Sequence, residues 1–202
     1  LDDYVSGLGS DVTGVILHCV NAGGTNASFG LRKNGSTDNR YTQLYSSCHF
    51  WAAIGVDSSH IFEANAGSPT SLDIYIVGYT TTGVTFRTNA ADKSLSTAGA
   101  WTDIDCSSEA PSAVGLVFEV RATTADGGLR KNGSTDDRHP TVFYHDCFGW
   151  IIGCDGSQIC EGYIGNTNVD FFLVGYITSG VIMNTNATDL SLDTLNTWLD
   201  LT

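Results

Sequence analysis

Hydrophobic and polar residues alternate in short runs along this chain, and the pattern predicts β-strands. The runs are rich in β-branched and aromatic residues and are separated by clusters of Gly, Asn, Asp and Ser, which favour turns. No window has the 3.6-residue period of an amphipathic helix. In the first half, strands are expected at residues 15–20, 50–56, 74–79 and 84–88. In the second half they are expected at residues 116–120, 150–154, 171–176 and 181–184.

The two halves are copies of one another. The sequence LRKNGSTD occurs at residues 31–38 and again, unchanged, at residues 129–136, which is an offset of 98. The match continues at an offset of 97 through pairs such as Trp101 and Trp198, and at 101 upstream of the motif. A period of this length is too long for a solenoid repeat, so each copy is a small domain. The spacing of strands and turns then predicts an all-β protein with two tandem, homologous antiparallel β-sandwich or barrel domains.

The repeat sets the expected boundaries. We expect an N-terminal strand at residues 1–12, a first β-domain at residues 13–105 and a second at residues 106–202. Inside the motif, Asn34-Gly35 and Asn132-Gly133 favour a type I′ turn at the tip of a hairpin. The leading segment of each copy has no sequential neighbour that is obliged to pair with it.

Positive charge is concentrated in the repeated motif. The formal net charge is −13, only nine residues are Lys or Arg, and six of the nine lie in or beside the two motif copies. Without another basic surface, nucleic acid is not an expected partner. The candidate contact residues are Arg32, Lys33, Asn34, Arg40, Arg130, Lys131, Asn132 and Arg138.

A turn requires Asn-Gly but not the charges around it, so these charges need another explanation. Arg32 and Arg130 could pair with Glu63 and Glu161, which share the offset of 98. Alternatively, the basic edge contacts an acidic face of another subunit. Exposed ion pairs stabilise little and buried ones need partners, so both interpretations stay open.

The six cysteines allow fifteen pairings. Cys154 and Cys160 have Val56 and Phe62 at the equivalent positions of the first copy, so both cysteines were gained across one expected hairpin. We therefore expect a disulfide between them, with two buried free thiols as the alternative. The pairing of the others stays open: Cys19, Cys48, Cys106 and Cys147.

No pattern in the chain indicates catalysis, a cofactor or a metal. The histidines and cysteines lack the spacings of zinc sites, and the acidic residues form no Ca²⁺ loop. His145-Asp146-Cys147 suggests a thiol–imidazole pair, but neighbours in a strand point to opposite faces, and the first copy lacks the set. No apolar run is long enough to span a membrane. Sparse charge with abundant Ser, Thr, Asn and Gly suits an extracellular, cell-surface or virion protein. Because residue 1 is Leu and not Met, we expect a removed signal peptide or a fragment.

The chain combines GLRKNGSTD, a strand ending in IVGY or LVGY, the sequence TNA and a closing Trp-x-Asp. In these features it resembles a group of uncharacterised β-rich proteins from environmental bacterial and phage-like sequences. The chain also looks like the protomers of pilus-like helical fibrils from fresh water. This resemblance implies donor-strand exchange, in which an N-terminal β-strand of one protomer completes the β-barrel of another. The donor would lie in residues 1–10 and include Leu1, Asp3, Tyr4 and Val5.

Three functions remain in competition. The first is a structural subunit of an extracellular fibril, which assembles with copies of itself through strand donation. The second is a phage or virion fibre or decoration protein. The third is a carbohydrate-binding module that uses aromatic residues near the motif, namely Tyr41, Tyr45, Phe143 and Tyr144. We expect the first function, because the leading strand has no obligatory partner in its own domain. We expect no enzyme, because the chain carries no catalytic motif.

Overall fold

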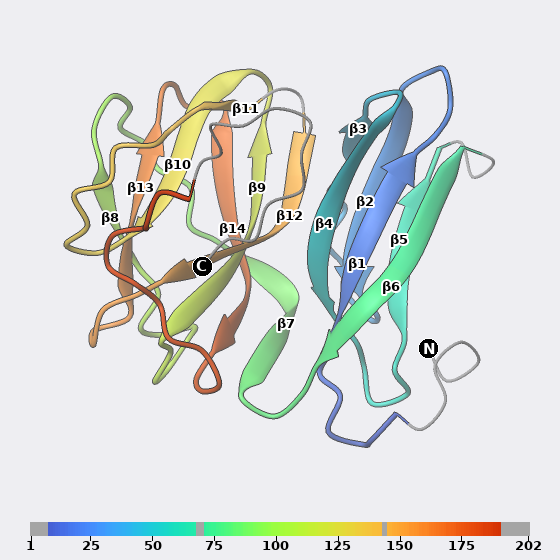
Figure 1. Cartoon of the computed structure of the whole chain (residues 1–202), viewed down its shortest axis with the longest axis horizontal. Helices are drawn as coiled ribbons and strands as arrows, with labels where there is room; N and C mark the ends of the chain where they lie inside the picture. Colours follow the sequence, from blue (N-terminus) through green and yellow to red (C-terminus); the bar gives the residue numbers. More distant parts are fainter. Residues whose placement is uncertain (1–7, 68–70, 143–144, 191–202) are drawn as a thin grey trace.

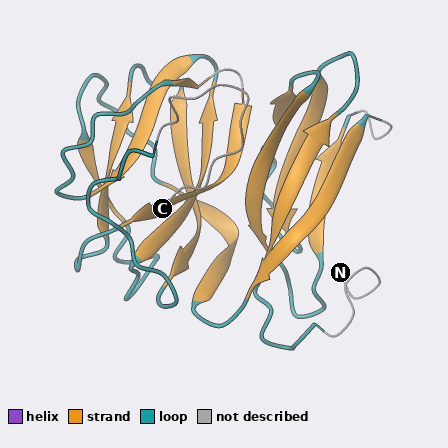
Figure 2. Ribbon diagram, viewed as in Figure 1, coloured by secondary structure: helices purple, strands orange, loops and turns teal. Residues whose placement is uncertain are grey.

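The computed structural model describes residues 8–67, 71–142 and 145–190. Within these residues the chain forms fourteen β-strands and no helix, which confirms the all-β class. The strands form four antiparallel sheets that pack in two pairs, so the protein consists of two β-sandwiches (Figures 1 and 2).

The first sandwich, on the right in Figure 1, has three strands in each sheet. Alternate residues of the central strand β1, including Val15, Leu17 and Cys19, point into the core and meet Phe29 and Leu31 of β2. One sheet has the order β4-β1-β6, with β1 at Gly14–Asn21, β4 at Cys48–Gly55 and β6 at Leu72–Thr80. The other has the order β3-β2-β5, with β2 at Ala27–Lys33, β3 at Thr42–Leu44 and β5 at Phe62–Ala66.

The second sandwich has four strands in each sheet. Its core contains the fully buried side chains of Leu116, Phe118 and Val120 from β9, which pack with Ile164 and Phe171. One sheet has the order β12-β9-β14-β7, with β7 at Val84–Asp92, β9 at Gly115–Ala122, β12 at His145–Gly153 and β14 at Val169–Ile177. The other has the order β11-β10-β13-β8, with β8 at Thr102–Asp105, β10 at Ala125–Lys131, β11 at Thr141–Val142 and β13 at Ile159–Ile164.

Two strands of the first sequence copy are built into the second sandwich. After a turn at Gly83, where φ is 101°, β7 pairs with β14. β8 likewise pairs with β13. The division in space therefore falls between β6 and β7, whereas the sequence repeat places the boundary at residue 105. This transfer explains why the first sandwich has three strands in each sheet and the second has four.

Phe86 of β7 joins the two sandwiches. A Cβ built on either Gly14 or Gly55 of the first sandwich would lie 2.4 Å from an atom of Phe86, so these glycines make room for it. On its other side Phe86 contacts Gly175 of β14, where a Cβ would lie 2.9 Å from the ring. Phe86 is only 5% exposed. It belongs to a cluster between the sandwiches that also contains Ala53, Val117, Val174 and Ile177.

One expected strand is wrong. Residues 181–184 follow β14 without forming a strand. Their counterpart in the first copy is the start of β7, which is stabilised by its backbone pairing with β14. An apolar run becomes a strand only where a partner edge is available, and residues 181–184 have none beside them in the part of the chain that the structure describes.

The expected type I′ hairpin is also wrong. The turn after β2 has Gly35 at φ 79° and a hydrogen bond of 3.1 Å from the Ser36 N–H to the Lys33 carbonyl, while Asn34 does not have a positive φ. This combination fits a type II turn. Gly133 has the same φ of 79° in the second copy. The chain then leaves β2 as a loop rather than returning directly as a hairpin.

The expected disulfide between Cys154 and Cys160 is not formed, and both thiols are free. Cys154 donates a hydrogen bond to the Ala113 carbonyl at 3.2 Å, and the buried thiol of Cys160 lies against that of Cys106 instead. The two thiols thus have different partners, although backbone hydrogen bonds close the turn between the two residues. Cys19, Cys48 and Cys106 are free as well, and the Cys147 side chain lies outside the described part of the structure.

Replacing Phe86 with Ala is expected to lower the free energy of unfolding by about 3–5 kcal/mol, because it leaves a cavity between the sandwiches. Chemical denaturation of monomeric protein measures this effect. Ile61→Ala serves as the control, since Ile61 is 46% exposed and its loss should cost less than about 1 kcal/mol. Equal stability of Phe86→Ala and the unchanged protein would contradict this role for Phe86.

The thiols are expected to react in an order set by burial. Burial raises the pKa of Cys19 to about 12 and that of Cys154 to about 11. Because the thiolate is the reactive form, only about one Cys19 in ten thousand is reactive at pH 8. Alkylation at pH 8 should therefore modify the exposed Cys48 first, and should reach Cys19 and Cys154 only after unfolding. Peptide mass mapping checks this order, and equal native rates for Cys19 and Cys48 would contradict it.

Candidate functional site

The repeated motif holds the strand that leaves its own copy. The side-chain oxygen of Asn89 accepts hydrogen bonds from the Ser36 hydroxyl at 3.0 Å and the Thr37 N–H at 2.9 Å. The next residue, Ala90, donates its N–H to the Asp38 carboxylate at 2.8 Å. The motif therefore binds residues 89 and 90 of β7, the strand that pairs with the second sandwich.

Two further residues of the motif support this contact. The Lys33 ammonium donates to the Phe86 carbonyl at 3.1 Å, so it holds β7 four residues earlier than Ala90. The Asn34 side chain donates to the Asp57 carboxylate at 2.5 Å, and this bond, together with backbone donors, lowers the pKa of Asp57. We call Lys33, Ser36, Thr37 and Asp38 the first strand clamp.

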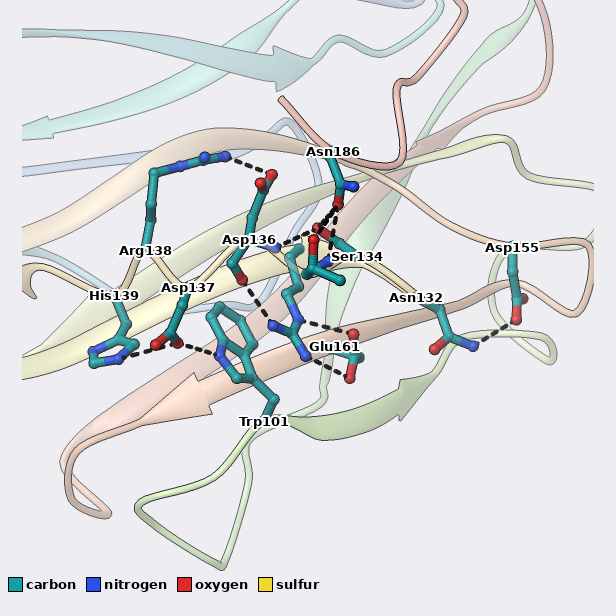
Figure 3. A network of polar contacts seen from close by, with 12 residues as sticks. Trp101, Asn132, Ser134, Asp136, Asp137, Arg138, His139, Asp155, Glu161 and Asn186 are labelled. Carbon is teal, nitrogen blue, oxygen red and sulfur yellow. Dashed lines mark hydrogen bonds and ion pairs between the residues drawn. The ribbon is translucent and has the colours of Figure 1, made fainter. Parts of the chain in front are cut away.

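The second copy contains the same arrangement, and Figure 3 shows the part of it that involves Ser134, Asp136 and Asn186. Asn186 accepts from the Ser134 hydroxyl at 2.9 Å and from the Thr135 N–H at 2.8 Å. The Ala187 N–H donates to the Asp136 carboxylate at 2.8 Å, and this bond is the main cause that lowers the pKa of Asp136. We call Lys131, Ser134, Thr135 and Asp136 the second strand clamp.

The segment held by the second strand clamp is fixed but not covered. Lys131 donates to the Met183 carbonyl at 3.0 Å, as its counterpart does to Phe86. Around these anchors residues 181–190 are mostly exposed, with Ile182 at 96% and Leu190 at 53%. An apolar segment is thus held at the surface without a partner strand among the described residues.

The two ion pairs expected from the repeat are both present. Arg32 lies 2.7 Å from the Glu63 carboxylate, and Arg130 binds both oxygens of Glu161 at 2.9 and 3.1 Å. Each arginine also donates to the backbone carbonyl of the aspartate in its strand clamp, at 2.6 and 2.7 Å. Arg32 therefore connects the loop that contains the first strand clamp to β5, and Arg130 connects the loop that contains the second strand clamp to β13.

Trp101 covers the ion pair of the second sandwich. The guanidinium carbon of Arg130 lies 4.2 Å from the centre of the indole ring, in the geometry of a cation–π contact. The indole N–H donates to the Asp137 carboxylate at 2.8 Å, and the ring contacts Tyr163. Under this cover the side chains of Arg130 and Glu161 are 17% and 14% exposed.

The equivalent ion pair of the first sandwich borders an open cavity. The cavity has a volume of about 320 Å³, and Gly30, Asn39 and Tyr41 are among the residues that line it with Arg32 and Glu63. The side chains of Arg32 and Glu63 are 37% and 40% exposed, which is more than twice the exposure of their counterparts. Among the residues that the structure describes, no side chain covers this ion pair as Trp101 covers the other one.

Arg40 and Arg138 differ although they are equivalent in the repeat. Arg40 reaches the second sandwich, where it lies 2.8 Å from the Glu119 carboxylate and 4.5 Å from the centre of the Phe172 ring. The side chains of Arg40 and Glu119 are only 15% and 2% exposed. Both arginines pair with the aspartate of their motif, Arg40 with Asp38 at 3.0 Å and Arg138 with Asp136 at 2.8 Å, but Arg138 is 63% exposed. One copy of this arginine is thus buried between sandwiches, and the other extends from the surface.

Burial and charge pairing act in opposite directions on the Arg40–Glu119 pair. Burial works against the charge on Arg40, but the hydrogen bonds and charges of Glu119 and Asp38 outweigh it and raise the pKa of Arg40. For Glu119 burial is the larger effect, and it raises the pKa of that carboxyl despite the bond from Arg40. One Glu119 oxygen has no hydrogen-bond partner in the described structure. Arg40 and Glu119 therefore form a buried junction, in which the charge of each side chain is stabilised by the other.

The outer faces of the homologous sheets β4-β1-β6 and β12-β9-β14-β7 also differ in their exposure. In the second sandwich Val117 and Val174 lie against the first sandwich and are 1% and 7% exposed. Their counterparts Ile16 and Val77 are 37% and 54% exposed. We call the uncovered surface on β4, β1 and β6 the aromatic face; it consists of Ile16, His18, Trp51, Tyr75, Val77 and Tyr79.

The aromatic face is organised across its strands. His18 stacks on Trp51 with ring centres 4.3 Å apart and shares a hydrogen bond of 2.9 Å with His49. Tyr75 lies opposite His18 on the neighbouring strand β6. Trp51 and Tyr75 are 56% and 53% exposed. Exposed, contiguous apolar surface of this kind is typical of sites that bind a partner.

Other expected site residues lie elsewhere. The donor residues Leu1, Asp3, Tyr4 and Val5 fall outside the residues that the structure describes, as do Phe143 and Tyr144. Tyr41 is 48% exposed and lines the cavity. Where the structure describes the chain, no three His, Cys, Asp or Glu residues are grouped to hold a metal ion. The same part of the chain contains no helix that could cross a membrane.

Comparison with known proteins found no matching family model, no similar curated protein and no similar solved structure.

The buried junction yields a prediction. Replacing Glu119 with Ala should lower the free energy of unfolding by about 3–5 kcal/mol, because it leaves Arg40 buried with less compensating charge. Glu63→Ala, at the more exposed pair with Arg32, should cost about 0–1 kcal/mol. Denaturation of both variants under the same conditions makes the comparison, and equal losses would refute the distinction. The double variant Arg40→Met with Glu119→Leu should recover most of the stability.

Proposed function

We propose that this protein is a structural subunit of an extracellular, pilus-like fibril, and that copies assemble through β-strand donation. Strand donation requires a sandwich that is incomplete by itself and a segment that can complete it. The observation that carries the proposal lies within a single chain: β7 and β8 of the first copy complete the sheets of the second sandwich. The fold thus uses strand donation already, as the link between its own two halves.

The first sandwich supports the proposal from the acceptor side. In the part of the chain that the structure describes, β6 and β5 are edge strands of their sheets. Their counterparts in the second sandwich, β14 and β13, are not edge strands, because β7 and β8 pair with them. An edge strand has unpaired N–H and C=O groups, and pairing with another chain satisfies them while it buries apolar side chains. A contact in which each copy donates and accepts at different places is heterologous and need not close, so repetition gives a filament.

The N-terminal donor stays a prediction. Residues 1–7 lie outside the described structure, and the segment that follows them belongs to its own sandwich. Leu8 packs against the core of the first sandwich, and Val12 within that core is 6% exposed. Donation by residues 1–7 would therefore start from an anchor at Leu8.

Purified protein is expected to form filaments above a critical concentration. Negative-stain microscopy and sedimentation across a concentration series test this, and the sedimenting fraction should rise from a threshold. Because the chain has a net charge of −13, added salt should lower the threshold by screening repulsion between copies. A monomer at every concentration and salt condition would reject the proposal, as would specific retention of the monomer on a polysaccharide matrix without assembly.

A further inference from the structure

The first sandwich lacks the features that β7 and β8 supply to the second. Within the described residues its sheets end at β6 and β5, its Arg32–Glu63 pair borders an open cavity, and its aromatic face has no cover. In the second sandwich each of these places is filled by a residue or strand of the first copy. The contacts that the second sandwich makes with the first copy therefore show where a strand from another protein chain would bind the first sandwich, at three separate places.

We propose that residues 181–202 of one copy complete the first sandwich of another copy. Residues 181–189 pair with β6, Trp198 enters the cavity beside Arg32, and the residues after Trp198 pair with β5. This inference rests on the proposed function, and it names the donor as the C-terminal segment. Residues 191–202 lie outside the described structure, so their part in the proposal comes from the sequence repeat.

The repeat assigns each part of the donor. An offset of 97 relates β7 to residues 181–189, and it relates Trp101 to Trp198. In the second sandwich Gly175 lies opposite Phe86, and Tyr176 lies opposite Thr85. The same register between copies places Met183 opposite Gly78 and Ile182 opposite Tyr79.

The surface around Gly78 matches this register. A Cβ on Gly175 would collide with β7, at 2.7 Å from the Thr85 carbonyl and 2.9 Å from the Phe86 ring. Among the described residues, a Cβ on Gly78 would meet only Ile16, at 3.6 Å and beyond. The space that Phe86 fills beside Gly175 is thus open beside Gly78, where the donor would place Met183.

The cavity has the chemistry that holds Trp101 in the second sandwich. Gly30 and Asn39 match Gly128 and Asp137 at the offset of 98. A Cβ on Gly128 would lie 3.0 Å from the Trp101 indole, so glycine is needed beneath that ring. In the first sandwich Gly30 preserves this space, Arg32 offers the cation and the side-chain oxygen of Asn39 can accept the indole N–H.

Arg138 is placed to reach the aromatic face. Its counterpart Arg40 lies on Glu119 and Phe172, whose counterparts on the first sandwich are His18 and Tyr75. Arg138 is 63% exposed and Tyr75 is 53% exposed, so both are available to another copy. A guanidinium over an aromatic ring is favourable without a carboxylate partner.

The direction of donation follows from the strand clamps. β7 is held by the first strand clamp and enters the sandwich that comes next, not its own. The second strand clamp holds Asn186 and Ala187 in the same way. The same geometry therefore sends residues 181–189 beyond the second sandwich, to the first sandwich of another copy.

Peptide binding tests the acceptor directly. A labelled peptide of residues 181–202 is titrated with the full chain below its assembly threshold and followed by fluorescence anisotropy. We expect Trp198→Ala in the peptide to weaken binding at least tenfold, because a central buried tryptophan is a typical hot spot. Gly78→Leu in the full chain should also weaken binding at least tenfold. Its side chain would occupy the space for Met183, while circular dichroism and thermal unfolding stay close to those of the unchanged protein. Equal binding by all variants, or no binding of the peptide to a chain that does assemble, would overturn the inference.

Assembly of the full chain separates this inference from the proposed function. We expect Trp198→Ala and Gly78→Leu each to raise the critical concentration at least tenfold, and deletion of residues 1–7 to leave it within twofold. Filaments that persist in both substitution variants but vanish with that deletion would sustain the fibril and reject the C-terminal donor. Specific peptide binding by a chain that never assembles would support the donor and reject the fibril. Absence of both binding and assembly would reject both.

Discussion

Pairing along the sheet edges is the constraint on which the rest of this structure depends. A strand at the end of a sheet leaves backbone donors and acceptors unpaired, and the second sandwich resolves this at β14 and β13 by taking β7 and β8 from the preceding copy. The position of the boundary between the sandwiches, the burial of Phe86 and the ion pair of Arg40 with Glu119 all follow from that transfer. The same transfer removes two strands from the first sandwich, whose sheets end at β6 and β5 in the part of the chain that the structure describes.

The repeated motif is understandable as the device that controls this transfer. A strand that must leave its own sandwich needs a fixed point of departure, because a free strand would compete for its own sheet edge. Ser36 and Asp38 supply that point by binding the side chain of Asn89 and the backbone of Ala90. Arg32 holds the clamp loop in shape through Glu63. The identical motif in the second copy binds residues 186 and 187 in the same way. In the described part of the chain, no sheet edge lies beside this segment, residues 181–187.

What could be predicted from the sequence depends on how local each feature is. Strand β1 and the pairing of Arg32 with Glu63 were accessible, because alternation and the repeat offset report them directly. The repeated Asn-Ala pair at residues 89 and 186 shared the offset of 97 with Trp101 and could have indicated a contact with the motif. The Arg40–Glu119 pair was not accessible, since it depends on how two sandwiches sit together. The failure at residues 181–184 has the same origin, because a strand there requires an edge that the sequence pattern cannot supply.

The junction inside the chain and the aromatic face differ in chemistry, and the difference agrees with the proposed assembly. Within the chain, Arg40 and Glu119 are desolvated once, during folding, and are then buried between the two sandwiches. At a junction between copies the same pair would have to lose its water at every addition step, which opposes assembly. The first sandwich has His18 in place of Glu119, and Trp51 and Tyr75 beside it. Aromatic side chains gain free energy when they are buried, and they stack with a guanidinium without needing a buried carboxylate. The aromatic face therefore fits the repeated docking that the proposed assembly requires, whereas the internal junction fits a contact that forms once, when the chain folds.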